Sequence, residues 1–221
     1  MTAPLVVVGA GGHARVVADI VRLLGSYSIV GYLDDVNPNR RGTAWNGATI
    51  LGGLDQLATL RASGVQAAVV AIGDCAARLR IAGRLADAGF DLPVFCHPRA
   101  VAAADAAIDA GTVLVAGAVV NPGARVGAHV IVNTSASVDH DCVIGDGVHI
   151  ACGARLGGGV HVGRGSWIGL SAAIKDHVRI GSGTVIGAGA LVLDDVPDGV
   201  VAYGVPAKVI RHVTTQHTIS S

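Results

Sequence analysis

The chain has 221 residues, with 16 Lys and Arg against 16 Asp and Glu, and only 14% of its residues are charged. This balance lacks the basic excess with which proteins bind nucleic acid or an anionic membrane surface, so we expect neither partner. No apolar run approaches the roughly 20 residues that span a bilayer, and Met1 begins no charged-then-apolar signal segment, so we expect a soluble, cytoplasmic protein.

Glycine and aromatic content are the unusual features of the composition. The chain holds 32 glycines, and only 3% of its residues are aromatic. A core with so few large rings must be filled by small and β-branched residues, which is typical of a tightly wound repeat. The cysteines show no C-x-x-C spacing and indicate neither a disulfide framework nor a zinc ribbon: Cys75, Cys96, Cys142 and Cys152.

Residues 1–97 carry alternating strand and helix patterns. Short apolar runs predict strands over residues 5–8, 28–33, 66–72 and 92–95. Apolar residues at helical spacing predict helices over residues 16–24, 54–62 and 76–88. The alternation predicts an α/β domain with a parallel sheet, which amounts to a half-Rossmann domain.

A glycine-rich turn follows the first predicted strand. Gly9, Gly11 and Ala14 fit the dinucleotide-binding fingerprint G-x-G-x-x-G/A, in which glycines let the backbone approach a phosphate at a helix N-terminus. Intact NAD binding, binding of a nucleotide-linked substrate, and a turn that only packs all fit this pattern. The half-length domain favours the nucleotide-linked substrate.

Two adjacent acids end the second predicted strand. A carboxylate at the carboxyl end of such a strand can accept hydrogen bonds from a base or a ribose, and Asp34 lies twenty residues beyond Ala14. Asp34 and Asp35 both qualify, and the pattern does not rank them. Either can instead be a solvated turn acid.

A six-residue repeat begins at Ile108. Fifteen consecutive positions at this spacing hold Ile, Leu or Val: Ile108, Leu114, Val120, Val126, Val132, Val138, Ile144, Ile150, Leu156, Val162, Ile168, Ile174, Ile180, Ile186 and Val192. A six-residue unit is too short for a helix pair and predicts one short strand and a turn, stacked into a parallel β-helix over residues 98–221. Three such units per coil would place each residue beside the residue 18 positions later.

A histidine between two acids interrupts the repeat at one turn. His140, flanked by Asp139 and Asp141, lies two residues past the inward Val138, so its ring should project from a corner of the β-helix. Histidine can take a proton near neutral pH, and a neighbouring carboxylate can fix its tautomer. One coil above, Gly158 would leave open space over the ring and an N–H that a substrate can reach.

His149 falls in another column of the β-helix, beneath Trp167. His140 and His149 can each instead be an exposed polar turn residue. Cys142 occupies a slim inward position of the repeat, so we expect a packed thiol and not a nucleophile.

Four stretches together carry a resemblance that covers nearly the whole chain. They are 9–13, 33–35, 133–145 and 204–208, with the repeat filling the rest of the C-terminal half. The chain resembles the sugar acetyltransferases of the left-handed β-helix superfamily, which acetylate nucleotide-linked amino sugars. The bacillosamine-pathway and GDP-perosamine N-acetyltransferases are the nearest groups, and the sialic acid O-acetyltransferases have a similar layout.

This resemblance implies a left-handed β-helix, a homotrimer, and active sites between neighbouring subunits. It implies that residues 1–97 hold the nucleotide sugar and that acetyl-CoA lies along residues 98–221. His140 matches the catalytic base and Asp141 the acid that orients it. Some relatives carry glutamate where this chain has Asp139 and Asp141, which leaves open which acid reaches the ring.

The other matched positions form two sets. The acetyl-CoA set contains His149 near the acetyl carbonyl, Gly158 as an N–H donor to that carbonyl, and Leu170 and Ala188 along the pantetheine arm. The acceptor set contains Gly11, Gly12, His13, Asp34 and Asp35.

The implied reaction is direct acyl transfer, in which the sugar amine attacks the acetyl-CoA thioester and gives its proton to His140. GDP-perosamine is slightly favoured over a UDP-linked 4-amino-4,6-dideoxy sugar as acceptor, and the relatives suggest lipopolysaccharide O-antigen as the destination. A hydroxyl acceptor, as in sialic acid O-acetylation, is the alternative.

Two further alternatives use the same fold differently. A zinc lyase like the γ-type carbonic anhydrases would need three converging histidines. The spacings of 11, 9 and 12 residues between His129, His140, His149 and His161 do not fall on one 18-residue column, so we expect no metal. A non-catalytic solenoid or an NAD-binding regulatory module would not bind CoA.

Overall fold

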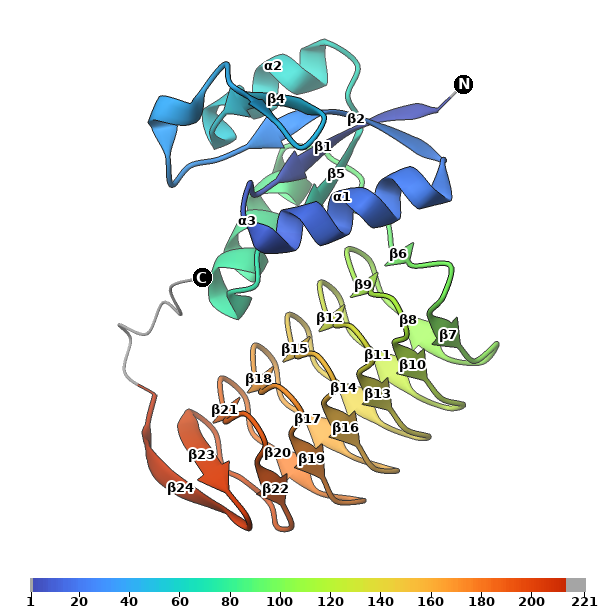
Figure 1. Cartoon of the computed structure of the whole chain (residues 1–221), viewed down its shortest axis with the longest axis vertical. Helices are drawn as coiled ribbons and strands as arrows, with labels where there is room; N and C mark the ends of the chain where they lie inside the picture. The colour runs from blue at the N-terminus through green and yellow to red at the C-terminus, as the bar shows by residue number, and fades with distance from the viewer. Residues whose placement is uncertain (1, 214–221) are drawn as a thin grey trace.

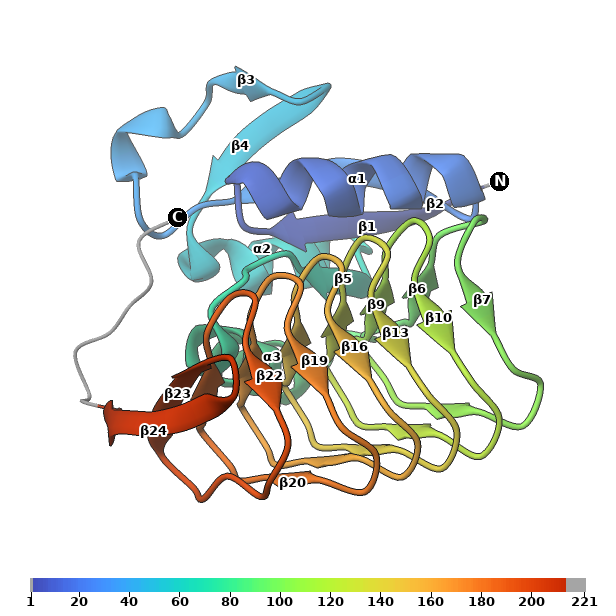
Figure 2. The same cartoon turned by 60° about the horizontal axis from the view of Figure 1, so that its bottom comes forward.

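The computed structural model of the protein describes residues 2–213, and the predicted C-terminal segment 214–221 lies outside the described residues. An α/β domain lies on one face of a three-sided β-helix (Figures 1 and 2). The domain's strands are β1 (Ala3–Val8), β2 (Tyr27–Leu33), β3 (Ala44–Trp45), β4 (Ala48–Gly52) and β5 (Ala67–Val70). Its helices are α1 (Gly12–Leu24), α2 (Leu57–Ala62) and α3 (Cys75–Asp87), with 3-10 turns η1 (Pro38–Arg40) and η2 (Leu54–Gln56). The sheet order is β3-β4-β2-β1-β5, parallel except for the β3–β4 hairpin.

These elements confirm the predicted helices and the predicted strands except the one over residues 92–95, which is wrong. Asp91 makes only an isolated bridge to Ala67, and Pro93 has no N–H to donate to a sheet. Phe95 and Cys96 pair with the β-helix instead. The β3–β4 hairpin was not predicted, although its Asn46-Gly47 turn, with φ of 43° and 82°, is a strong hairpin signal.

Three parallel sheets form the sides of the left-handed β-helix. Sheet I contains β6 (Phe95–Cys96), β9 (Val113–Leu114), β12 (Ile131–Val132), β15 (His149–Ile150), β18 (Trp167–Ile168), β21 (Val185–Ile186), β23 (Val200–Gly204) and the antiparallel β24 (Ala207–His212). Sheet II contains β7 (Val101–Ala102), β10 (Val119–Val120), β13 (Ser137–Val138), β16 (Arg155–Leu156), β19 (Ala173–Ile174) and β22 (Leu191–Val192). Sheet III contains β8 (Ala107–Ile108), β11 (Arg125–Val126), β14 (Val143–Ile144), β17 (His161–Val162) and β20 (Arg179–Ile180). The chain runs from sheet I to II to III and back, and we name the corners I–II, II–III and III–I.

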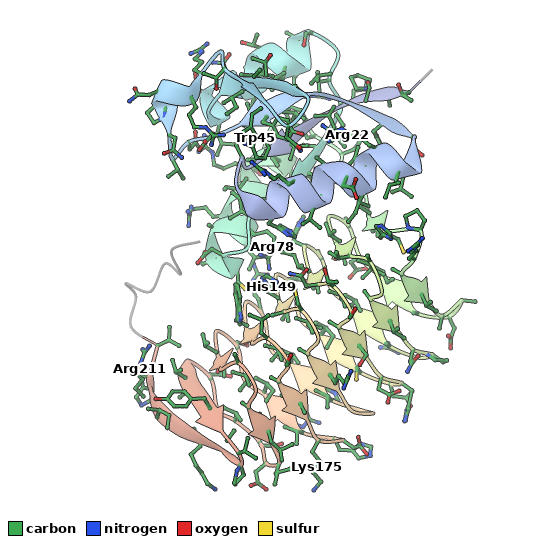
Figure 3. All side chains as sticks on the ribbon, in the orientation of Figure 1. Arg22, Trp45, Arg78, His149, Lys175 and Arg211 are labelled. Atoms are coloured by element: carbon green, nitrogen blue, oxygen red, sulfur yellow. The ribbon has the colours of Figure 1, made fainter. Side chains whose placement is uncertain are left out.

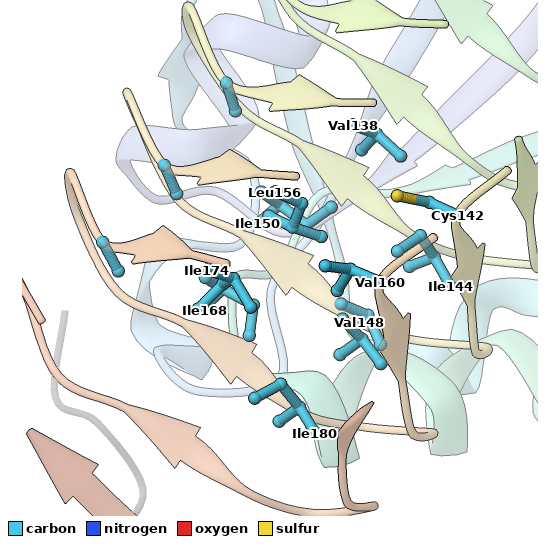
Figure 4. Packing of buried hydrophobic residues seen from close by; sticks show 14 of the residues in the cluster. Val138, Cys142, Ile144, Val148, Ile150, Leu156, Val160, Ile168, Ile174 and Ile180 are labelled. Atoms are coloured by element: carbon cyan, nitrogen blue, oxygen red, sulfur yellow. The ribbon is translucent and has the colours of Figure 1, made fainter. Parts of the chain in front are cut away.

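The six-residue repeat builds both the register and the core of the β-helix. Val138 is the Cα partner of Val120 and of Leu156, which confirms the predicted 18-residue stacking. Fourteen of the fifteen repeated aliphatic residues are buried, and Ile108 is partly buried against them. Slim residues such as Cys142 fill the space between them (Figure 4).

Two glycine columns account for the unusual composition. One turn position in each unit has a positive φ and is usually glycine, as at Gly147 with φ of 64°. The other glycine directly follows the inward residue, where a methyl group on Gly145 would lie 2.7 Å from the Arg164 nitrogen of the next coil. Non-glycine residues take the positive-φ position of the β-helix at His129, Ser135, Asp141, Ser171 and His177, where the conformation costs roughly 1–2 kcal/mol.

The α/β domain packs on sheet I through an apolar cluster. Leu5 and Val17 of the domain are buried together with Phe95, Val113 and Val115 of the β-helix. This contact places the first turns of α1 and α3 over β15. Within residues 2–213, no helix combines the length and the apolar character needed to cross a bilayer.

Candidate active site

His140 and Asp141 form a hydrogen-bonded pair at the II–III corner. The Nδ1 atom of His140 lies 2.8 Å from Oδ2 of Asp141. Asp141 has a φ of 58°, in the left-handed region that aspartate tolerates better than most residues. Asp139 is occupied elsewhere, because its Oδ1 accepts hydrogen bonds from Asn121 Nδ2 and from the His140 backbone N–H, both at 2.7 Å. Asp141 is therefore the acid that reaches the ring.

This pairing makes His140 a stronger base with one nitrogen free. The carboxylate accepts from Nδ1–H, which leaves the lone pair on Nε2. The hydrogen bond that His140 donates to Asp141 raises the pKa of His140 above its ordinary value, and the nearby Asp139 and Asp176 carboxylates add to this effect. The His140 side chain is 60% exposed, so an acceptor can approach it.

Gly158 lies over the His140 ring, as the 18-residue stacking predicts. A methyl group on Gly158 would be 2.6 Å from Nε2 of His140, so only glycine leaves room there. The prediction that the Gly158 N–H is open to a substrate is wrong. That N–H donates to Oδ1 of Asp176, one coil further on, at 3.2 Å.

His149 lies on sheet I and is buried beneath the α/β domain. Its Nδ1 is 3.2 Å from the Gly73 carbonyl, and its Nε2 is 3.1 Å from Nδ2 of Asn133. Its ring centroid is 4.2 Å from that of Trp167, which confirms the predicted column. Burial first, and then Arg78 and His13, lower the pKa of His149 to about 3, so the ring is neutral.

His13 lies in the first turn of α1, with its ring centroid 6.3 Å from that of His149. Its Nε2 is buried without a hydrogen-bond partner among the described residues. Burial, followed by the charge of Arg78, lowers the pKa of His13 to about 4. An unpartnered nitrogen beside a second neutral imidazole is suited to a polar group of a ligand.

Gly11 and Gly12 leave the N-terminus of α1 open. Gly11 caps the helix without a side-chain hydrogen bond, and the first turn holds no acid. A methyl group on either glycine would meet nothing within 4 Å. The free N–H groups of this turn can therefore bind an anion.

The two predicted acceptor acids both accept hydrogen bonds within the chain, but only Asp34 is buried. Asp34 is buried and pairs with Arg40 at 2.9 Å, and it also accepts from the Val36 N–H at 3.0 Å. Asp35 accepts from the Leu54 N–H at 2.8 Å. Both carboxylates shape the turn after β2. The buried Asp34 is not presented to an acceptor as predicted, whereas Asp35 is exposed and its role as an acceptor-binding acid stays a prediction.

Cations that were not predicted lie beside the glycine turn. Arg40 donates to the Ala10 carbonyl at 3.2 Å, and the guanidinium carbons of Arg40 and Arg15 each lie 5.7 Å from the Trp45 ring centre. Trp45 comes from the β3–β4 hairpin and also contacts Tyr32 edge-on at 4.6 Å. The Asn46-Gly47 turn was the sequence signal that could have found this cluster.

Leu170 and Ala188 are exposed and stacked at the I–II corner, where the Gly189 N–H donates to the Leu170 carbonyl at 2.7 Å. They follow strands of sheet I, the sheet that also carries His149. His140 and Gly158 lie at the II–III corner instead, together with Lys175. Figure 3 shows Lys175 on the side of the β-helix opposite Arg78 and His149. One chain alone therefore does not bring His140 to the His13–His149 cluster.

Cys142 and the possible metal ligands are the residues that two other chemistries would use. Cys142 lies with its Sγ 3.2 Å from the Gly157 carbonyl, and burial raises the pKa of its thiol to about 11. Across residues 2–213, no three His, Cys, Asp or Glu side chains gather as a metal-binding group.

The geometry can be compared with known proteins. Residues 4–85 match the sequence family described as the PglD N-terminal domain. No curated protein matches the sequence.

Solved structures match almost the whole chain. The acetyltransferase domain of PglB from Neisseria gonorrhoeae FA1090 is 40% identical with a TM-score of 0.89, and the match covers 95% of this chain and 100% of that domain. PerB from Caulobacter crescentus, solved with CoA and GDP-perosamine, is 36% identical with a TM-score of 0.90 over 95% of this chain and 98% of PerB. WeeI from Acinetobacter baumannii AYE is 28% identical with a TM-score of 0.85 over 95% and 100% of the two chains.

Proposed function

Because the chain belongs to the hexapeptide-repeat family of acetyl-CoA-dependent sugar N-acetyltransferases, we propose that it acetylates the 4-amino group of a nucleotide-linked 4-amino-4,6-dideoxy sugar. The observation that carries this proposal is the His140–Asp141 pair, whose free Nε2 faces the side-chain-free Gly158. GDP-perosamine is our preferred acceptor, since PerB was solved with this sugar nucleotide and is 36% identical to the chain.

The proposed reaction is a direct transfer. The neutral sugar amine attacks the thioester carbonyl of acetyl-CoA, so a C–N bond forms, the C–S bond breaks, and CoA leaves as the thiolate. The amine proton passes to Nε2 of His140, and the imidazolium then returns it to the thiolate. Asp141 holds the ring in the required tautomer, and a base in this role contributes about 10²- to 10⁴-fold to the rate. The inward, high-pKa thiol of Cys142 argues against a covalent acetyl-enzyme.

The open end of α1 supports a nucleotide diphosphate as the handle of the acceptor. The N–H groups after Gly11 and the guanidinium groups of Arg15 and Arg40 would face its negative charge. His13 would lie beyond the phosphates, toward the sugar.

The separation of the two clusters supports a homotrimer. His140 and Gly158 lie at the II–III corner of the β-helix, whereas His149 lies on sheet I with His13 beside it. We place each active site between two subunits, with His140 of one chain facing the His13–His149 cluster of the next. Acetyl-CoA would then run along the corner of Leu170 and Ala188.

Release of free CoA thiol from acetyl-CoA tests the proposal. GDP-perosamine, a UDP-4-amino-4,6-dideoxy sugar and free sialic acid serve as parallel acceptors. Turnover with one amino sugar supports the proposal and identifies the nucleotide. Turnover with sialic acid alone would replace it with O-acetylation, and silence with all three would refute the assigned acceptor class.

A further inference from the structure

Arg78 is a fully buried arginine whose charge meets no carboxylate within the described chain. It is 1% exposed and none of the ion pairs among residues 2–213 includes it. Its guanidinium donates instead to backbone carbonyls at 2.7–3.3 Å: those of Ile72, Gly73, His129, Gly147 and Val148. A buried charge is costly unless it is fully hydrogen-bonded, and these five carbonyls supply the acceptors that the Arg78 guanidinium needs.

These carbonyls belong to two parts of the molecule. Residues 72–73 follow β5 in the α/β domain, whereas His129 and residues 147–148 lie at the III–I corner of the β-helix. The planar guanidinium thus ties the segment before α3 to the edge of sheet I. Figure 3 shows Arg78 and His149 together at this junction.

The Gly73 carbonyl connects Arg78 to His149. It accepts from Nη1 of Arg78 at 2.7 Å and lies 3.2 Å from Nδ1 of His149. A carbonyl can only accept, so Nδ1 must carry the hydrogen. Nε2 then accepts from Nδ2 of Asn133, and the Asn133 amide is oriented by its Oδ1, which accepts from the Thr134 N–H at 2.8 Å. One consistent network therefore fixes a neutral His149 with the hydrogen on Nδ1.

We propose that Arg78 is a positioning residue for acetyl transfer, which fixes the Gly73 carbonyl and through it the tautomer and orientation of His149. This inference rests on the proposed function, in which His149 lies beside the acetyl group. Arg78 itself does not touch the reacting atoms, because its side chain is fully buried between the α/β domain and the β-helix.

A lysine in place of Arg78 tests whether the positive charge alone is sufficient or whether the hydrogen-bond geometry of the guanidinium is needed. Arg78→Lys keeps the positive charge, but a single ammonium has three donors and cannot serve five carbonyls in a planar fork. The Gly73 carbonyl should then move, and His149 should lose its fixed tautomer. Arg84→Lys is the matched control, because Arg84 is an exposed residue of the same helix.

The experiment records ¹⁵N spectra of histidine-labelled full-length protein together with steady-state kinetics. The His149 signal is identified by its loss in His149→Asn. Wild type should show a neutral ring with the hydrogen on Nδ1, and Arg78→Lys a mixture of tautomers. We expect kcat to fall about 10- to 100-fold in Arg78→Lys, with the KM for the sugar nucleotide changed less than about threefold, and Arg84→Lys to match wild type. In the His149→Asn background, Arg78→Lys should lower kcat no further.

A wild-type His149 with its hydrogen on Nε2 would overturn the proposal even if Arg78→Lys failed to fold. A folded Arg78→Lys with unchanged kcat, or with an equal loss in the presence and absence of His149, would also overturn it. Because the spectra need no substrate, failure of the acetyltransferase assignment would be seen separately, as absent turnover in a wild-type protein whose His149 tautomer is intact.

Discussion

The side chains of His140 and Asp141 meet at 2.8 Å although the two residues are adjacent in sequence, because Asp141 adopts a left-handed backbone with φ of 58°. Most units of the repeat place glycine at this turn position. Aspartate in this conformation costs free energy. Its carboxylate accepts a hydrogen bond from Nδ1 of His140, which leaves the lone pair on Nε2.

Asp141→Asn should move the acidic limb of the kcat/KM profile to lower pH. The carboxylate raises the pKa of His140, so its removal lowers that pKa, and the base form then persists at lower pH. Activity at the plateau should fall at least about tenfold, since an asparagine amide can also hold the wrong tautomer. Asp139→Asn is the control and should shift the limb less, because Asp139 contacts Asn121 and not the ring. An unmoved limb in Asp141→Asn would contradict this pairing.

His140→Ala should lose most of its activity but not all of it. An unprotonated amine is already a good nucleophile, so positioning should retain part of the rate. We expect the loss of kcat in the thiol-release assay to stay below about ten-thousandfold. The exposed side chain contributes little to folding, so the unfolding free energy should change by less than about 0.5 kcal/mol. A larger loss with folding intact would point to a hydroxyl acceptor.

Gly158→Ala tests the space above the catalytic ring. Its methyl group would lie 2.6 Å from Nε2 of His140, so the ring has to tilt and break its alignment with the acceptor. We expect kcat to fall by about tenfold or more, while the thermal midpoint barely changes. Gly83→Ala, in α3 and free of close neighbours, should keep wild-type kcat. Equal kcat values for Gly158→Ala and Gly83→Ala would show that Nε2 of His140 takes no part in the reaction.

His149 should make the protein less stable in mild acid. Its pKa is about 3 in the folded state and 6.5 in an unfolded chain, so only the unfolded chain takes up this proton between those values. The contribution of the neutral His149 ring to the unfolding free energy is fully present above pH 6.5. Below pH 6.5 this contribution falls by about 1.4 kcal/mol per pH unit. Denaturant unfolding between pH 4 and 7 should show a flatter dependence for His149→Gln than for wild type.

The β-helix was predictable almost residue by residue, because its repeat determines its own neighbours. The inward Val138 and the stacking of His140 under Gly158 both follow from counting 18 residues. The Gly158 N–H was misjudged because the same count applied to Gly158 leads to Asp176, whose carboxylate turns back onto it.

The α/β domain was less predictable where contacts depend on loops. Asp34 looked like a ligand-binding acid, and only the folded turn after β2 reveals that Arg40 already holds it. Arg78 gave no signal, since its partners are carbonyls up to 70 residues away and a carbonyl has no sequence signature.

The 18-residue register also bears on how the protein is made. Within the β-helix, the strands of each coil pair with the strands of the coils before and after it. On a ribosome that adds about 5–20 residues per second, a new coil emerges every one to four seconds, whereas short strands pair in about microseconds. Each new coil can therefore pair at once with the folded coil that precedes it. Leu5 and Val17 of the α/β domain become buried as soon as Val113 and Val115 are synthesised. We expect assembly to proceed from the N-terminus to the C-terminus in the order of translation, with never more than one unpaired coil exposed.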